Sequence, residues 1–302
     1  MITIGSRGSA LALAQTGWVK SQIQGRFPGM EVNVKVITTS ADRNQTASIR
    51  SGSAVGVFVK ELEQALLAKD IDIAVHSMKD VPTSIPAELR IAAVPMREDA
   101  RDAFLARNAS SLLDLPAGSL VGTGSVRRQA QLLALRPDLR VADIRGNVDT
   151  RLKKLQDGAF DAIILACAGL NRLGLQDKIS SPIDFSHMLP APGQGALAIE
   201  VRGDDSQALQ VTAPLNHAPT AAAVGGERRF LHHMGGGCNV PVAVYARLSG
   251  NRMQIDALVA SPDGKIILRD SESGEPDSAS EAAALLAERM LKRGARTILG
   301  KL

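Results

Sequence analysis

The stretch IDIAVHSMKDVP, residues 71–82, puts chemically capable side chains directly after a buried-strand pattern. Its apolar residues between 71 and 75 predict a strand of a parallel sheet that is buried on both faces. Pro82 prevents the strand from continuing. Open α/β sheets build their sites at the carboxyl ends of such strands, so the stretch is either a functional edge or an ordinary polar turn. The side chains concerned are His76, Ser77, Lys79 and Asp80.

Arginine residues accumulate at three predicted strand-to-helix junctions. The N-terminus of a helix carries about +0.5 of an elementary charge, so cations are unfavourable there unless an anion is also present. Backbone N–H groups and guanidinium forks together make a good cradle for a polyanion. Any single arginine could instead be solvated or paired with a local acid such as Asp143 or Asp149, whereas the whole set favours a shared anionic ligand. The set is Arg7, Arg127, Arg128, Arg145 and Arg151.

These arginines change the interpretation of Asp80. The strand-to-helix junctions of a doubly wound sheet open at one edge, so we expect Asp80 to border an arginine-lined crevice. Neighbouring cations would keep its carboxylate ionised at neutral pH. An ionised carboxylate is suited to stabilising a cationic intermediate. A salt bridge to one of the arginines is the simpler alternative, and both can hold.

The two cysteines have different surroundings. Cys238 lies in the glycine-rich loop GGGCNVP, where its thiol could be an attachment point, a nucleophile or a group without function. Cys167 lies in the apolar stretch AIILACAGL and is expected to be a buried small hydrophobe. Neither belongs to a CxxC pair, so the sequence predicts no zinc site and no disulfide framework.

Alternating strand and helix patterns position these residues. Residues 1–94 and 119–166 each predict a sheet flanked by helices, and 95–103 is a candidate connection between the two. A further strand is predicted at 196–201. After residue 212, a helix, three meandering strands and a long helix predict a small α+β domain.

Local signals give further detail. Ser9, Ser125 and Asn147 precede predicted helices and are candidate N-caps. The stretch 42–55 is rich in serine, glycine and charge, and is expected to be a mobile loop.

Composition excludes several classes of protein. The 302 residues are 45% hydrophobic and 22% charged, as in globular proteins, and suffice for two or three domains. An aromatic content of 3% and a net charge of +4 argue against a base-stacking nucleic-acid surface. We expect no signal peptide, because the first residues, MITIGSRGSA, lack a charged segment and a long apolar segment. We expect no membrane span, because the longest apolar run, 162–170, is too short. A cytoplasmic, reducing setting fits.

Taken together, the motifs closely resemble those of the hydroxymethylbilane synthase family, also called porphobilinogen deaminase. The matching stretches follow the family's order from residue 4 to beyond 241, and the C-terminal domain matches mainly in pattern. HSMKDVP and RGNVDTR together are highly specific. The stretches are GSRGSALALAQ, FVKELEQALL, DIAVHSMKDVP, REDARDAF, GTGSVRRQAQL, RPDL, IRGNVDTRL, DAIILACAGLNRLG, LPAPGQGALAIE and GGGCNVP.

The resemblance implies three domains. The expected fold is α/β, with two periplasmic-binding-protein-like lobes of parallel or mixed sheets and a small C-terminal α+β domain with an antiparallel three-stranded sheet. Domain 1 would comprise 1–95 and 196–214, domain 2 would comprise 100–192, and domain 3, carrying the cysteine loop, would comprise 217–302. The active site would lie in the cleft between the first two.

The resemblance also implies the reaction. The family condenses four porphobilinogen molecules head to tail with loss of ammonia, then releases the linear tetrapyrrole hydroxymethylbilane for haem biosynthesis. The primer is a dipyrromethane cofactor held by a thioether to the cysteine that corresponds to Cys238. The expected partners are porphobilinogen and its oligomers, with no nucleic acid, membrane or metal, and the expected state is a monomer.

Roles carry over residue by residue. The catalytic aspartate corresponds to Asp80, facing the cation left when ammonia departs. The acetate and propionate groups of porphobilinogen explain why many arginines would surround one crevice. The substrate- and cofactor-binding positions correspond to Arg7, Ser77, Lys79, Thr123, Ser125, Arg127, Arg128, Arg145, Arg151, Arg172 and Gln194.

The sequence departs from the family pattern at three positions. Val55 stands where a lysine is usual, Gly124 where a serine is often doubled, and Gly235 where the cysteine loop commonly has glutamate. None of the three is the aspartate or the cysteine. They leave open two alternatives to the enzyme: a non-catalytic, two-lobed anion-binding module, or an inactive paralogue.

Overall fold

The computed structural model resolves the chain into two compact units. The residues that it describes are 1–38, 59–235 and 240–300. The first unit comprises Met1–Glu98 and Ala196–Ala221, and the second comprises Asp99–Gly195 and Ala222–Leu302. The loop expected at 42–55 lies outside the described residues, as do Val55 and Cys238.

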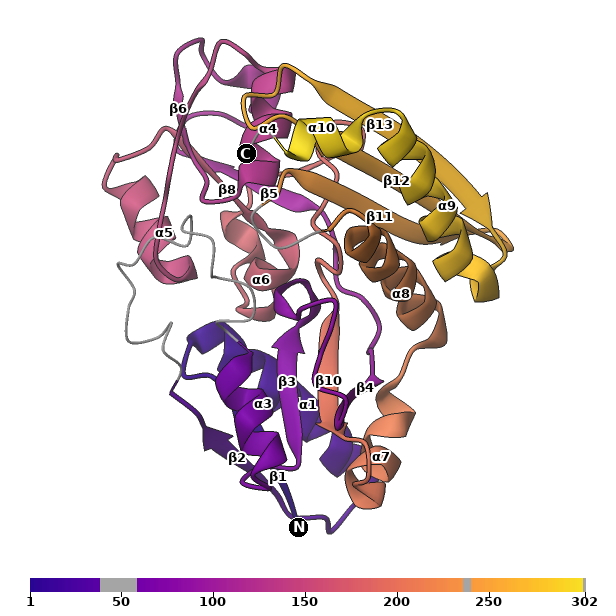
Figure 1. Cartoon of the computed structure of the whole chain (residues 1–302). Coiled ribbons are helices and arrows are strands. Elements are labelled where there is room, and N and C mark those ends of the chain that lie inside the picture. Colours follow the sequence, from indigo (N-terminus) through magenta and orange to yellow (C-terminus); the bar gives the residue numbers. More distant parts are fainter. Residues whose placement is uncertain (39–58, 236–239, 301–302) are drawn as a thin grey trace. The chain divides into compact units, whose positions relative to one another are not determined.

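The first unit is built on a mixed five-stranded sheet (Figure 1). Strands β2, β1 and β3 are parallel, whereas β10 runs antiparallel to both of its neighbours, β3 and β4. In spatial order the strands are β2 (Val32–Val36), β1 (Ile2–Ser6), β3 (Ile73–Ser77), β10 (Leu197–Arg202) and β4 (Leu89–Ala93).

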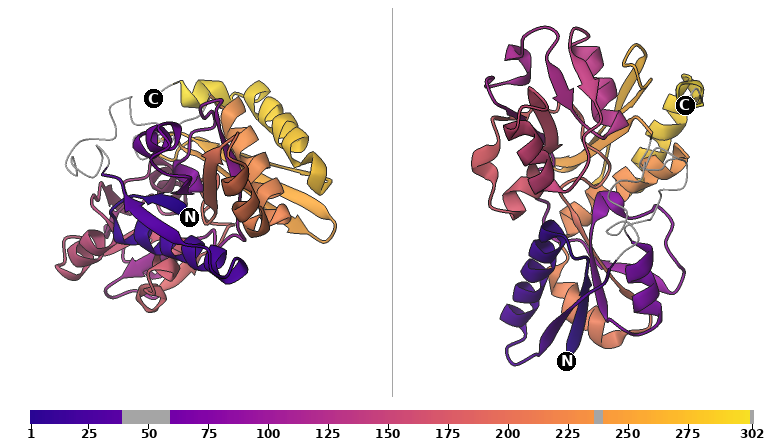
Figure 2. Two further views of the ribbon diagram at one scale, coloured as in Figure 1. Left: turned by 90° about the horizontal axis from the view of Figure 1, so that it is seen from below. Right: turned by 90° about the vertical axis from the view of Figure 1, so that its left-hand side faces the viewer.

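Helices cover both faces of this sheet, α1 on one side and α3 on the other in the right-hand view of Figure 2. Because successive strand residues face opposite sides, Ile73 and Val75 pack in the cluster that includes α1, and Ala74 packs in the cluster that includes α3. The Ser9 hydroxyl accepts a hydrogen bond from the Ala12 N–H (3.3 Å), so the predicted cap is confirmed. The helices are α1 (Ala10–Arg26), α3 (Lys60–Leu67) and α7 (Ser206–Thr212).

The second unit contains a sheet of the same plan. Strands β7, β6 and β8 are parallel, and β5 runs antiparallel to β8 and β9. In both sheets the antiparallel strand is the one that the chain forms after passing from one unit to the other. In spatial order the strands are β7 (Arg140–Ala142), β6 (Leu120–Gly122), β8 (Ala162–Ala166), β5 (Asp102–Ala106) and β9 (Ser181–Ile183).

Helices again lie on both faces of this second sheet. Ser125 and Asn147 cap α4 and α5, as predicted, by accepting hydrogen bonds from the N–H groups of Arg128 and Thr150. These caps fix the points at which the arginine-bearing segments leave the sheet. The helices are α4 (Val126–Leu135), α5 (Val148–Gln156) and α6 (Cys167–Arg172).

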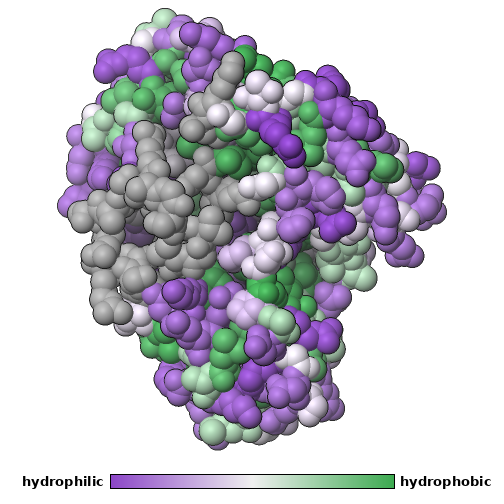
Figure 3. Space-filling model, viewed as in Figure 1, coloured by the Kyte–Doolittle hydropathy of each residue, from purple (hydrophilic) through white to green (hydrophobic). Residues whose placement is uncertain are grey.

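The second unit ends in an antiparallel three-stranded sheet, in the order β11, β12, β13. Phe230, Ile255 and Leu286 belong to the core that joins this sheet to its helices. The outer surface of α9 and β13 is largely hydrophilic (Figure 3), as expected of a layer whose apolar side faces that core. The elements are α8 (Ala218–His233), β11 (Val242–Ser249), β12 (Arg252–Ala260), β13 (Ile267–Gly274), α9 (Ala279–Lys292) and α10 (Ala295–Leu299).

This C-terminal sheet packs directly on α4. A Cβ atom at Gly264, in the β12–β13 turn, would lie 2.5 Å from the carbonyl oxygen of Ala130 on α4. Phe185 and Tyr245 stack with their ring centroids 4.2 Å apart. Arg269 donates to the carbonyl oxygen of Phe185. Ala130 on α4 also shares an apolar cluster with Leu258 and Ala260, so the helix that carries Arg127 and Arg128 is held against this sheet.

The predicted fold class is confirmed: two mixed α/β sheets and a small α+β part with three antiparallel strands. The predicted three-domain division stays a prediction. Five elements were not predicted, namely β5, α6, β9, α7 and α10. Beyond these, the described residues form short 3-10 helices at Met78–Asp80, Leu112–Asp114, Gln176–Lys178, Ala213–Leu215 and Pro276–Ser278.

Candidate active site

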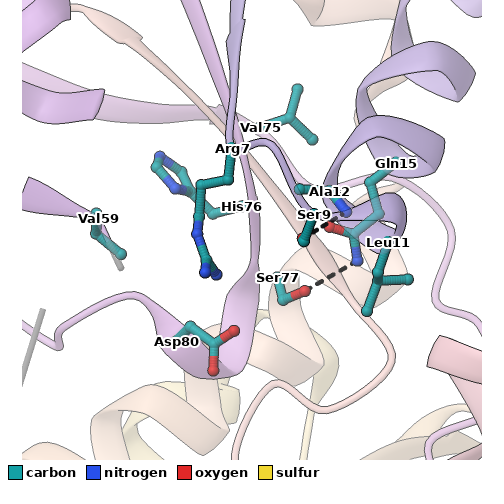
Figure 4. Close-up of a pocket in the computed structure, with 10 residues that line it drawn as sticks. All are labelled: Arg7, Ser9, Leu11, Ala12, Gln15, Val59, Val75, His76, Ser77 and Asp80. Carbon is teal, nitrogen blue, oxygen red and sulfur yellow. Dashed lines mark hydrogen bonds between the residues drawn. The ribbon is translucent and has the colours of Figure 1, made fainter. Parts of the chain in front are cut away.

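In the first unit, the carboxyl ends of β1 and β3 border a pocket of about 70 Å³. Arg7 follows β1, and Asp80 ends the 3-10 helix that follows β3. Figure 4 shows both side chains extending into the same space, with the guanidinium of Arg7 directed toward the carboxylate of Asp80. Arg7 and Asp80 therefore line the same pocket of this unit, and the role predicted for Asp80 stays a prediction.

The turn that presents Asp80 is fixed by its backbone. The Met78 N–H donates to the carbonyl oxygen of Ala196 (3.0 Å), and the Val81 N–H closes the 3-10 helix on the carbonyl oxygen of Met78. Met78 is buried, so Lys79 and Asp80 are left at the rim of the sheet.

Ser77 points to the α1 side of β3. The Gln15 side chain donates to its hydroxyl (2.9 Å, Figure 4). Gln15 is buried and lines the pocket, yet it was not among the predicted site residues. The signal that could have found it is a polar residue on the same helix face as Leu11 and Val19, four residues away on either side.

His76 points to the opposite, α3 side of β3. Its Nε2 lies 2.9 Å from Oε2 of Glu200 on β10, and both side chains are buried. Burial raises the pKa of Glu63 on α3, and the charge of Glu200 raises it further, whereas His76 opposes the rise. Neither carboxylate was predicted from the sequence.

In the second unit, Asp102 at the start of β5 is fully buried and binds three predicted site residues. Arg127 Nη1 donates to its Oδ2 (2.8 Å), Arg128 Nη2 to its Oδ1 (2.7 Å) and Gln194 Nε2 to its Oδ1 (2.9 Å). Burial alone would raise the pKa of Asp102, but the charges of Arg127 and Arg128 outweigh burial and hold it well below its ordinary value. Asp102 was not predicted; its one signal is an acid directly before the apolar run 103–105.

Arg151 lies in a cationic environment. Its Nε donates to the carbonyl oxygen of Gly146 (2.8 Å), and in the described part of the chain no carboxylate lies within ion-pair distance of it. Burial and then the charge of Arg128 lower its pKa to about 10, with Asp143 opposing them. A nearby anion would relieve this repulsion.

The remaining predicted residues of this unit have protein partners. Arg145 pairs with Asp143 (2.7 Å), one of the local acids that the sequence offered as an alternative partner. Arg172 donates to the carbonyl oxygen of Gly195 (2.6 Å). Thr123 Oγ1 accepts from the N–H of Ser125 (3.2 Å), and Ser125 is the cap of α4.

Gly124 has little room for a side chain. A Cβ atom there would lie 3.1 Å from Oδ1 of Asp143 and 3.2 Å from the carbonyl oxygen of Ile144. A serine at this position would require Asp143 to shift, and Asp143 is the partner of Arg145. Glycine at position 124, where the family often has serine, therefore fits the limited space beside Asp143 and Ile144.

Cys167 is buried, as expected, and burial followed by the charges of Asp99 and Asp102 raises the pKa of its thiol to about 12. Such a thiol is a poor nucleophile. Among the described residues, no cluster of histidine, cysteine and acid side chains could hold a metal ion. Over the same residues, no helix is both long enough and apolar enough to cross a membrane.

The fold defines the class of protein, an α/β protein built on two mixed sheets. Residues 2–210 match the family model described as porphobilinogen deaminase, dipyromethane cofactor binding domain. Residues 221–292 match the model for the porphobilinogen deaminase C-terminal domain. The chain belongs to the porphobilinogen deaminase family.

Curated relatives match over nearly their whole length. The porphobilinogen deaminase of Desulforudis audaxviator is 47% identical over 300 residues, covering 99% of this chain and 97% of the relative. That of Thermus thermophilus is 46% identical over 303 residues, covering 100% and 99%. That of Syntrophobacter fumaroxidans is 45% identical over 299 residues, covering 99% and 97%.

Solved structures that are similar include the methionine-binding protein MetQ, with a TM-score of 0.45 and 14% identity over 71% of this chain and 89% of that one. An ABC transporter periplasmic substrate-binding protein from Coxiella burnetii gives a TM-score of 0.44 and 12% identity over 76% and 97%.

The predicted family, enzyme class and cofactor are confirmed. The activity is that of a transferase of tetrapyrrole biosynthesis that uses a dipyrromethane cofactor. Of the alternatives that the sequence left open, the enzyme is the one that the family comparison supports.

Proposed function

We propose that Asp80 is the catalytic carboxylate of this reaction and that Cys238 carries the cofactor through a thioether. The observation that carries the role of Asp80 is its place beside Arg7 in the pocket at the end of β3. Arg7 and Asp80 extend into the same space, so the positive charge of Arg7 lies beside the carboxylate. A charged carboxylate on a rigid strand end costs little reorganisation when positive charge develops on a substrate.

The chemical demand on Asp80 comes from the substrate. When ammonia leaves porphobilinogen, the remaining fragment is cationic, and a fixed carboxylate lowers the energy of that charge. Dipyrromethane, when bound, supplies the pyrrole carbon to which the next unit is joined. Asp80 would hold the pyrrole N–H groups, and Ser77, kept in place by Gln15, would help to orient them.

The arginines of the second unit fit the acidic side chains of the cofactor and substrate. Arg151 is half-buried, and burial and the charge of Arg128 lower its pKa, so an incoming carboxylate would offset the repulsion between the two guanidinium groups. The Nε of Arg127 is buried and has no hydrogen-bond partner among the described residues. Arg7, Lys79, Thr123, Ser125, Arg128, Arg145, Arg172 and Gln194 would complete the binding set.

The same proposal includes the wider organisation of the protein. Separate hydrophobic cores within the second unit support treating 100–192 and 217–302 as distinct domains beside 1–95 with 196–214. A thioether requires a free thiol at Cys238, which a reducing, cytoplasmic compartment preserves. We propose a cytoplasmic monomer that acts on porphobilinogen and its oligomers.

Replacing Asp80 with Asn tests the catalytic role. Asn has nearly the same shape but no charge, so the variant should bind porphobilinogen and lose turnover by about 10²–10³-fold, the usual effect of removing one electrostatic stabiliser. Turnover is measured from tetrapyrrole formation, and intact mass establishes that the cofactor is still attached.

Asp204→Asn is the matched control, because Asp204 is an exposed aspartate in the same unit. It should leave turnover within about twofold, as expected of a surface change. Normal tetrapyrrole production by the Asp80→Asn variant would contradict the role of Asp80. Cys238→Ser, which should never gain the cofactor mass on incubation with porphobilinogen, tests the attachment site separately.

A further inference from the structure

The strand that precedes Asp80 loses one of its neighbours before it ends. β1 pairs with β3 only at Ile73 and Ala74, whereas β10 pairs with β3 as far as Ser77. From Val75 onward, β3 is therefore held by main-chain ladder bonds on one side only. This is the segment from which Ser77 and the turn carrying Asp80 leave the sheet.

A buried pair of side chains fastens this segment to β10. In the antiparallel register, Ala198 lies opposite His76 and Glu200 lies opposite Ala74, so His76 and Glu200 are diagonal neighbours on one face. Their side chains are 3% and 0% exposed and approach to 2.9 Å. Leu197, Ile199 and Val201, on the other face of β10, are part of the apolar core.

Glu63, on α3, supplies a second carboxylate above the same face. Burial and the charge of Glu200 raise its pKa, and His76 lowers it, so the three groups are electrostatically coupled. In the part of the chain that the structure describes, Oε1 of Glu63 and Oε1 of Glu200 are buried without hydrogen-bond partners. The cluster thus contains two buried carboxylate oxygens without a hydrogen-bond partner in the described chain, which is unfavourable for stability.

We propose that His76 is a positioning residue for the catalytic turn, held by Glu200. The inference rests on the proposed role of Asp80. A buried polar pair often contributes less to stability than well-packed apolar residues of similar volume would, but it specifies one arrangement. Here it specifies the register of β3 on β10. A slip by one residue would turn His76 to the α1 face and Ser77 away from Gln15.

His76 borders the same pocket as Asp80, but its side chain is almost fully buried against Glu200, so we infer that it acts through its neighbours rather than on the substrate. Its side chain fixes the strand at the residue before Ser77, and the Met78 N–H bond to the carbonyl oxygen of Ala196 carries the same register into the turn. Asp80 is two residues beyond Met78. Loosening His76 should move the carboxylate while leaving the arginines of the second unit unaffected.

The test compares His76→Ala, Glu200→Ala, their double variant and Glu200→Gln, using porphobilinogen and protein whose cofactor is verified by intact mass. Each alanine variant should lower kcat by about ten- to a hundredfold, because small misplacement of catalytic groups has effects of that size. KM should stay within about twofold. The double variant should be no slower than the slower single, since the residues act as a unit.

Glu200→Gln keeps an oxygen that can accept a hydrogen bond from His76, so it should recover most of the kcat that Glu200→Ala loses. This conservative variant also decides the matter if an alanine variant fails to fold. Circular dichroism and thermal midpoints identify the folded variants, and kinetics are measured well below the lowest midpoint.

Asp205→Ala is the matched control. Asp205 pairs with Arg202 at the far end of the same strand and caps α7, so its loss should destabilise the unit without reaching the catalytic turn. It should leave kcat unchanged at temperatures where the variant is folded. If it lowered kcat as much as His76→Ala, the pair would be merely structural and the proposal would be wrong.

Two further outcomes would overturn the positioning role: normal kcat in both alanine variants, or additive losses in the double variant. Failure of the underlying function is distinguishable. If Asp80→Asn is inactive while His76→Ala turns over normally, only the positioning role fails. If Asp80→Asn itself turns over normally, the proposed role of Asp80 fails, and the positioning role fails with it.

Discussion

Asp102 shows how a residue outside the predicted site can control it. The sequence places Arg127 and Arg128 side by side at the start of α4, where their charges repel each other and the helix N-terminus. Asp102 offsets that repulsion by accepting from both guanidinium groups and from Gln194. The two arginines are thus internal ion-pair partners, whichever ligands they also contact.

Removing the charge of Asp102 should be costly. In Asp102→Asn two buried guanidinium groups lose their counter-ion, so the free energy of unfolding should fall by about 3–5 kcal/mol. Urea unfolding monitored by circular dichroism measures the change. Asp177→Asn is the control, because Asp177 is well exposed and pairs only with its neighbour Lys178 in the described chain; its effect should stay within about 0.5 kcal/mol.

The sign of the pH dependence follows from the lowered pKa of Asp102. A carboxyl whose pKa is lower in the folded state stabilises the fold above its unfolded pKa, about 3.9, and loses this effect as the pH falls toward the folded value. The difference between wild type and Asp102→Asn should therefore be full at pH 7 and shrink below about pH 4. A difference that grew on acidification would contradict this account.

At the scale of elements, the β12–β13 turn illustrates a close approach that only glycine permits. Gly264 has a φ of +72°, and a Cβ atom there would collide with the backbone of α4, 2.5 Å from the carbonyl oxygen of Ala130 and 2.7 Å from the nitrogen of Ala134. Backbone atoms cannot move away as a flexible side chain can. The C-terminal sheet and α4 must therefore separate if the glycine is replaced.

Gly264→Ala should lower the free energy of unfolding by about 2–4 kcal/mol, since strain of positive φ and steric overlap act together. Gly250→Ala is the matched control: its φ is +61°, but its Cβ atom would meet nothing within 4 Å. Gly250→Ala should lower the free energy of unfolding only by the strain of a positive φ in a residue with a Cβ atom, about 1 kcal/mol. Equal losses in the two variants, measured by urea unfolding, would show that the contact with α4 contributes nothing.

Elements with strong local signals were predictable from the sequence. Helices α4 and α5 begin at Ser125 and Asn147, as their capping residues indicated. Helix α6 was not predicted because the apolar run through Cys167 is compatible with a buried strand or a helix. Strand β5 was not predicted because its polar start, Asp102, makes sense only once Arg127 and Arg128 are nearby.

Some residues of the candidate site were likewise predictable from the sequence, and others were not. Residues in compact motifs, such as Ser77 and Asp80, could be found because the motif is specific and follows a strand. Partners that are distant in sequence could not: Glu200 is 124 residues from His76, and Gln15 is 62 from Ser77. Such pairs depend on strand order and register, which one sequence does not encode in any local pattern.

At the scale of the whole molecule, the two units have separate hydrophobic cores. We expect calorimetry to resolve two unfolding transitions, as is common when a chain contains more than one compact unit. Asp205→Ala should lower the midpoint of one transition and Gly264→Ala that of the other. A single transition that both variants shift equally would show that the units unfold together.

The strand order of the first unit has a consequence for synthesis of the chain. β3 and β4 are adjacent only through β10, which leaves the ribosome after the whole of the segment Asp99–Gly195. Until Leu197–Arg202 emerges, the nascent first unit has an open gap in its sheet, and β3 exposes the edge that bears His76. The part of the chain made first is thus completed after most of the second, so a translational pause before residue 197 would leave an aggregation-prone edge in place of a finished catalytic turn.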